Sequence, residues 1–147
     1  MTDNPMALQH AVPVPGKRYF TLNEALRALP LVKRIAADIQ STQANRLRIH
    51  TELSSGLAEH TNPRHEALQD EFDRETQRLE GLIEELTRIG VELKDPARGL
   101  LDFPSLHEGR EILLCWKADE ATITAWHEVD SGFTGRKPVS LLQESGG

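Results

Sequence analysis

The chain has 147 residues, which is the length of one domain. Hydrophobic residues make up 38% and charged residues 27%, which favours solvated helices with narrow apolar stripes. The net charge of −6 argues against general binding to nucleic acid or to an anionic membrane, because both need a positive surface. The single cysteine excludes an intrachain disulfide, and with no signal-peptide pattern we expect a cytoplasmic protein.

The first part of the chain predicts an arm followed by a long helical region. Residues 1–17 contain three prolines and no hydrophobic period, so we expect them to be mobile. Thr21 followed by Glu24 is a capping box, which predicts that a helix begins there. Helical spacing of apolar residues continues to about Leu53. Pro30 interrupts the pattern and predicts either two successive helices, the first of them short, or one kinked helix.

A second long helix is predicted from Pro63, with Asn62 as its cap, to a stop at Gly90. Its apolar residues have the spacing of a coiled-coil seam: Leu68, Phe72, Leu79, Leu82, Leu86 and Ile89. Residues 17–53 carry seven basic and three acidic side chains, whereas residues 59–90 carry four and nine. We therefore expect a long antiparallel helical hairpin, and its two narrow apolar stripes predict a homodimer formed through the long helices.

After Gly90 the hydrophobic period changes from helical to alternating. The stretches GLLDF, REILLCWKA and TITAWHEV predict a small antiparallel three-stranded β-meander. The predicted fold class is therefore α+β. We expect a single domain over residues 18–139, with helices over about 21–90, a β element over about 91–130 and a tail over 140–147.

The last predicted hairpin determines which side chains share a face. A tip at Asp119 and Glu120 would place Ile112 opposite His127. Alternation along the strands then puts His127 on the apolar face and Glu128 on the other. These two neighbours are candidate catalytic residues, but they point in opposite directions and cannot easily bind one ion.

The carboxylates of Glu111, Glu128 and Asp130 are expected to gather on the face opposite His127. Carboxylates that share a site repel each other unless a cation or a proton lies among them. Oxygen ligands suit Mg²⁺ or Mn²⁺, so these three residues form a candidate metal site. The simpler alternative is that they are solvated or pair with Arg136.

Two other side chains of these strands have simpler interpretations. His127 is also explained as a core histidine with one ring nitrogen hydrogen-bonded. Cys115 would need a nearby base to act as a nucleophile, and the predicted alternation offers none.

The turn SGFTGRKP is a candidate anion site. Gly132 and Gly135 permit positive φ, so backbone amides could converge on an anion beside Arg136 and Lys137. The simpler alternative is a tight turn with a solvated basic tip.

Three blocks in this order resemble a known family: YFTLNEALRALPLVKRI, GVELKDPARGLLDFPSLHEGREILLCWK and AWHEVDSGFTGRKPV. The chain resembles the bacterial family called domain of unknown function 2203 over residues 18–139. The resemblance implies a helical amino-terminal half, a small carboxy-terminal β element and a cytoplasmic bacterial protein. It implies no activity, cofactor or catalytic residue.

Two functional hypotheses follow from these patterns. The first is a small cytosolic homodimeric protein that serves as a helical interaction or scaffold module. The second is a small enzyme or ligand-binding protein with a divalent-metal or anion site at the end of the carboxy-terminal sheet.

Overall fold

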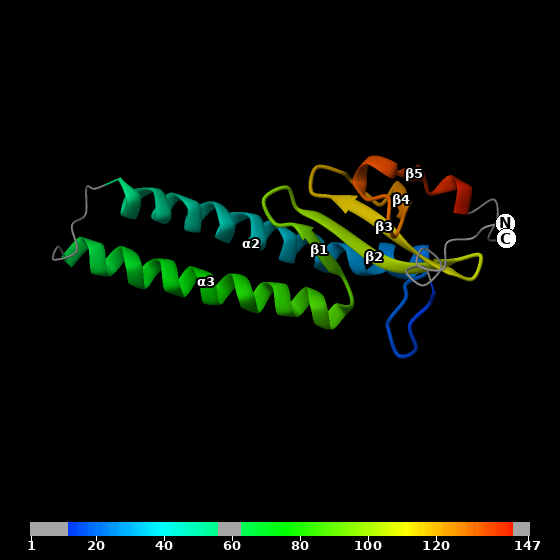
Figure 1. The fold of residues 1–147 in the computed structure, drawn as a ribbon, viewed down its shortest axis with the longest axis horizontal. Coiled ribbons are helices and arrows are strands. Elements are labelled where there is room, and N and C mark those ends of the chain that lie inside the picture. Colours follow the sequence, from blue (N-terminus) through cyan, green and yellow to red (C-terminus); the bar gives the residue numbers. More distant parts are fainter. Residues whose placement is uncertain (1–11, 56–62, 143–147) are drawn as a thin grey trace.

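The computed structural model describes residues 12–55 and 63–142, and it has the predicted α+β class. Figure 1 shows two long helices lying side by side, with a sheet at one end of the pair. Within the described residues, neither helix has an apolar stretch long enough to cross a membrane. The elements are α2 Leu22–Ser54, α3 Pro63–Ile89, β1 Glu92–Asp95, β2 Leu100–His107, β3 Arg110–Lys117, β4 Ala125–Glu128, η1 Phe133–Gly135 and β5 Lys137–Pro138.

Helix α2 begins at the predicted capping box and continues through its proline. The Thr21 amide donates to the Glu24 carboxylate at 2.8 Å, and the Glu24 amide donates to the Thr21 hydroxyl at 3.0 Å. Pro30 lies inside one continuous helix, so the two-helix alternative is wrong. Pro30 is exposed, whereas Leu29 and Val32 on either side are buried in one core. Packing of the flanking residues thus outweighs the missing backbone hydrogen bond.

Helix α3 also has the predicted bounds, although its predicted cap Asn62 lies outside the described residues. At its end Gly90 adopts a left-handed φ of 101°, and the Val91 amide donates to the Leu86 carbonyl at 3.0 Å. This arrangement satisfies a terminal carbonyl of the helix and confirms the predicted stop.

The predicted seam of α3 packs against α2 of the same chain. Its buried residues are Leu68, Leu79 and Leu86. Polar contacts also join the helices: Arg46 donates to Thr76 at 3.0 Å, and Arg78 donates to Thr42 at 3.2 Å. The apolar stripes therefore cover each other within one chain.

The sheet has five strands in the order β1-β2-β3-β4-β5, and each strand is antiparallel to the next. The prediction of three strands was wrong because β1 and β5 are too short to show alternation, and β2 extends beyond the predicted break at Pro104. The Pro104 carbonyl accepts the Phe20 amide at 2.7 Å, so the backbone of Pro104 faces away from β3. Its missing amide proton therefore removes no hydrogen bond between β2 and β3.

The register of β3 with β4 differs by one residue from the prediction. Ile112 pairs with Glu128, and Leu113 pairs with His127. The strands are joined by residues 118–124 instead of a two-residue tip, and the Glu120 amide donates to the Lys117 carbonyl at 2.8 Å within this connection. A shift of one residue exchanges the faces of the sheet, so the predicted facial arrangement of β4 relative to β3 was wrong.

One face of the sheet, α2 and the carboxy-terminal part of α3 form the main hydrophobic core, and Figure 1 shows α2 passing along the sheet. The residues that β2, β3 and β4 contribute to this core are Leu101, Phe103, Ile112, Leu114, Trp116 and Trp126. The opposite face of the sheet therefore carries the alternate residues of each strand.

We expect two glycine substitutions to separate backbone strain from steric crowding. Gly99 and Gly109 both have left-handed φ, but a Cβ on Gly99 would lie 2.6 Å from the Ala118 Cβ, whereas a Cβ on Gly109 would have no neighbour within 4 Å. G109A should lower the free energy of unfolding by about 1 kcal/mol. G99A should lower it by about 2–4 kcal/mol, because overpacking adds to the strain. Urea unfolding of both variants measures the difference. Equal decreases in the free energy of unfolding would contradict steric crowding at Gly99.

Candidate metal centre

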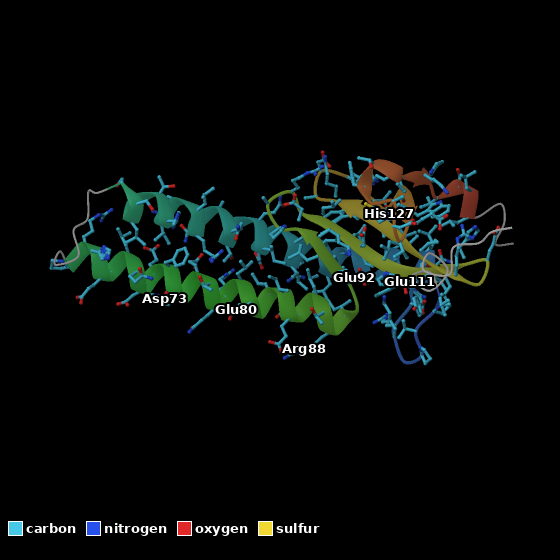
Figure 2. All side chains as sticks on the ribbon, in the orientation of Figure 1. Asp73, Glu80, Arg88, Glu92, Glu111 and His127 are labelled. Atoms are coloured by element: carbon cyan, nitrogen blue, oxygen red, sulfur yellow. The ribbon has the colours of Figure 1, made fainter. Side chains whose placement is uncertain are left out.

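Three buried polar side chains from three neighbouring strands meet on the face of the sheet away from α2. Asp102 on β2 pairs directly with Cys115 on β3, and His127 on β4 lies diagonally across from Cys115. Their exposed fractions are 1%, 0% and 3%. Figure 2 shows His127 within the sheet. Because paired strands hold all three residues, their relative positions are fixed by the sheet itself.

The ring of His127 is oriented by hydrogen bonds at both nitrogens. Nδ1 lies 2.8 Å from the Glu128 carbonyl oxygen, and Nε2 lies 3.2 Å from each carboxylate oxygen of Asp102. A carbonyl oxygen only accepts, so Nδ1 carries a proton and donates it. The ring orientation therefore directs Nε2 towards Asp102.

The metal-free cluster contains a buried ion pair. Burial acts to lower the pKa of His127, but hydrogen bonds to Asp102, Cys115 and the Glu128 carbonyl raise that pKa to about 10. The imidazole is therefore protonated at neutral pH and pairs with the Asp102 carboxylate. Buried charges of this kind are stable only while both partners are present.

The cluster also offers one nitrogen, one sulfur and one oxygen donor to a cation. Among the described residues, Asp102, Cys115 and His127 are a group whose ligand atoms all lie within 4.8 Å of one another. Zn²⁺ accepts this combination of ligands, and histidine ligands usually donate their other ring proton to a carbonyl or carboxylate. The Nδ1 contact with the Glu128 carbonyl already has this form, so a divalent ion would replace the proton on Nε2 and, by binding Cys115 as a thiolate, the proton of its thiol.

The carboxylates predicted to bind a metal together are separated in the structure. Glu111 lies on the same face as Cys115, and it accepts hydrogen bonds at 2.8 Å from both Lys17 and Tyr19. Glu128 points to the other face, because it pairs with Ile112. The third candidate, Asp130, is exposed. The candidate oxygen-ligand site is therefore not assembled by these residues.

Glu128 instead forms an ion-pair cluster. Arg110 donates to its two oxygens at 2.8 and 2.7 Å, and Lys137 lies 3.3 Å away. The hydrogen bonds from Arg110, more than any other interaction, lower the pKa of Glu128 to about 2. His127 and Glu128 thus point in opposite directions, as predicted, but His127 lies on the face opposite the main core rather than within it.

Several donors of the predicted anion-binding turn bind within the protein, whereas the buried Nε of Arg136 has no hydrogen-bond partner among the described residues. The Gly135 amide donates to the Gly132 carbonyl at 3.0 Å. Arg136 donates to both Glu120 oxygens at 2.8 Å, and Lys137 pairs with Glu128. The turn therefore stabilises itself and its neighbouring strands.

The sequence reasoning missed Asp102 and gave Cys115 no basic neighbour. The register error, which placed His127 on the face opposite Cys115, explains the missing basic neighbour. Asp102 was missed because no pairing of the GLLDF strand with the next strand was predicted. A usable signal was present in GLLDF, where a lone acidic residue interrupts an apolar strand. A charged residue in a buried strand needs a partner across the sheet.

Removal of the Asp102 carboxylate should destabilise the metal-free protein strongly. We expect D102A to lower the free energy of unfolding by about 3–5 kcal/mol, because it leaves His127 buried without its partner. D119A is the matched control. The Asp119 side chain is 70% exposed, and its replacement removes an ion pair with the Lys117 Nζ at 3.4 Å. Chemical denaturation in the presence of a chelator measures both variants. Similar stabilities of D102A and D119A would contradict the buried ion pair.

Comparison with known proteins identifies a family but no characterised relative. Neither the curated proteins nor the solved structures contain a match to this chain. A family model described as "Uncharacterized conserved protein (DUF2203)" matches residues 18–139, which include both long helices, the whole sheet and all three residues of the cluster. The chain therefore belongs to the DUF2203 family.

Proposed function

We propose that this protein binds a divalent transition metal of the zinc class through Asp102, Cys115 and His127. The observation that carries the proposal is the convergence of nitrogen, sulfur and oxygen donors from three paired strands. Buried charges in proteins are paired with one another or coordinate a metal. The same donors also lie on a rigid sheet, which suits a site that selects its ion by geometry.

The donor set favours zinc-class ions over the Mg²⁺ or Mn²⁺ suggested by the carboxylate pattern. Mg²⁺ and Mn²⁺ prefer oxygen ligands, whereas Cys115 supplies sulfur and His127 supplies an imidazole nitrogen. Asp102 is the single oxygen ligand residue of the cluster. A thiolate ligand also suits a reducing compartment, in which Cys115 remains free.

The burial of the site favours a structural role for the metal. Structural zinc sites are closed and usually have four protein ligands, whereas catalytic sites have three protein ligands and a position open to water or substrate. Asp102, Cys115 and His127 are three ligand residues, so it is the enclosure of the site, and not the ligand count, that favours the structural role. All three residues are at most 3% exposed, so a bound ion would be enclosed. An ion at this point links β2, β3 and β4, and its binding energy contributes directly to the stability of the carboxy-terminal half.

We expect the protein refolded with Zn²⁺ to retain one ion per chain and to unfold at a higher temperature. A free zinc concentration 100 times Kd stabilises a protein by about 2.7 kcal/mol, whereas Mg²⁺ should have no effect. Refolding with Co²⁺ should give a thiolate-to-cobalt charge-transfer band. Because Cys115 is the single cysteine of the chain, this band reports on that residue alone.

Two alanine variants provide the matched comparison. C115A should lose the cobalt band and most of the zinc affinity. S105A also replaces a buried polar residue of the same sheet, but Ser105 faces the main core and donates to the Phe20 carbonyl, so this variant should keep both. If the wild-type protein retains no zinc and forms no thiolate–cobalt band, the proposal is rejected.

A second candidate function is homodimeric interaction through the long helices. Figure 1 shows α2 and α3 extending well beyond the sheet, and there their apolar contact is small: Ile49 and Leu68, with Leu53 and Phe72 partly buried. Leu47 in this part of α2 is 64% exposed. A second copy, aligned by the opposite charges of the two helices, would cover this surface and complete a bundle.

We expect sedimentation equilibrium at micromolar concentration to detect a dimer. L47E should weaken it, because the variant buries a charge in the interface. L106E is the control, since Leu106 is also an exposed leucine, at 49%, but lies on β2. A monomer at all concentrations would remove this second candidate without affecting the metal site.

A further inference from the structure

The turn at residues 131–138 reaches both β3 and β4 on either side of the cluster. We propose that this turn sets the metal affinity of the Asp102–Cys115–His127 site, with Arg136 and Lys137 as positioning residues. The inference rests on the proposed metal-binding function and deepens it, because it assigns the control of the site to a separate segment. It also gives the basic residues of SGFTGRKP a role that is not anion binding.

Arg136 holds the strand that carries the sulfur ligand. Its Nη2 donates to the Cys115 carbonyl at 3.4 Å and to both Glu120 oxygens at 2.8 Å. Glu120 in turn accepts the Lys117 amide at 2.8 Å through its carboxylate, and its carbonyl accepts the Trp116 indole at 2.9 Å. Arg136 therefore fixes both the backbone of Cys115 and the connection that determines the register of β3 with β4.

Lys137 holds the residue that orients the nitrogen ligand. Its Nζ lies 3.3 Å from the Glu128 carboxylate and 4.7 Å from the centre of the Trp126 ring. The Glu128 carbonyl accepts the Nδ1 proton of His127 at 2.8 Å, and Ser131 donates to the same oxygen at 3.2 Å through both its amide and its hydroxyl. Ser131 and Lys137, at the two ends of the turn, thus both contact Glu128, whose carbonyl orients the His127 ring.

The glycines of the turn are required for this approach. Gly132 adopts a left-handed φ of 64°, which a residue with a side chain rarely adopts. A Cβ on Gly135 would lie 2.6 Å from both side-chain atoms of Ser131. The chain can then return along β4 and form β5, in which Lys137 pairs with Trp126.

Positions outside the ligand set influence metal affinity because they fix the orientation of the ligands. Without Arg136 the Cys115 carbonyl loses a hydrogen bond, and without Lys137 the Glu128 carboxylate loses an ion pair. The ligand atoms then sample a wider range of positions, and metal binding must restrict them. Weaker binding and a changed ligand geometry are the expected consequences.

The test compares R136A with R98A, and K137A with K94A. Arg98 and Arg136 both stack on the Phe133 ring, with distances of 5.2 and 4.7 Å to its centre, but only Arg136 donates to Cys115. Lys94 is an exposed lysine paired with Glu92 on β1. Zinc affinity is measured by competition with a chelator, and the thiolate–cobalt band is recorded for each variant.

We expect R136A and K137A to bind zinc about 10- to 100-fold more weakly, with a shifted cobalt band, and the two controls to match the wild type. The band shift separates positioning from a general loss of stability, which would leave the spectrum of the bound ion unchanged. If wild-type protein binds zinc but R136A and K137A match R98A and K94A, the turn has no such role. If wild-type protein binds no zinc, the proposed function fails instead. Should R136A not fold, K137A carries the test alone.

Discussion

The pairing of β3 with β4 is the constraint on which the chemistry of this protein depends. With Leu113 opposite His127, the imidazole shares a face with Asp102 and Cys115. A shift of one residue would turn His127 towards α2 and leave the buried Asp102 carboxylate without its histidine partner. The connection through Glu120, held by the Arg136 guanidinium, maintains the observed register.

The cluster shows how a small protein accommodates buried charge. Without metal, hydrogen bonds to Asp102 and to the Glu128 carbonyl satisfy both nitrogens of His127. With a metal, the same arrangement presents Nε2 while the Nδ1 contact is preserved. One geometry therefore serves the ion pair and the proposed metal site, and little rearrangement separates the two states.

The helices and the sheet contribute differently to the molecule. The amino-terminal part of α2 and the carboxy-terminal part of α3 belong to the main core with the sheet, whereas their opposite ends share only a small apolar cluster. Figure 2 shows Asp73 and Glu80 along α3, away from the sheet. The sheet thus carries the candidate chemistry, and the helices present a long polar surface on which a partner could align through charge.

Local sequence determined the capping box at Thr21, the span of α3, its stop at Gly90 and the α+β class, because these features depend on residues a few positions apart. It did not determine the strands β1 and β5, the continuity of α2 through Pro30, or the register that brings Asp102, Cys115 and His127 together. Those features depend on contacts between distant residues: the length of a connection, the backbone partner of Pro104 and the cover of a core. Side chains alternate with a period of two, so a one-residue difference in the register of β3 with β4 changes which residues form the site. That register depends on the conformation of the connection between the strands, which only the tertiary structure determines.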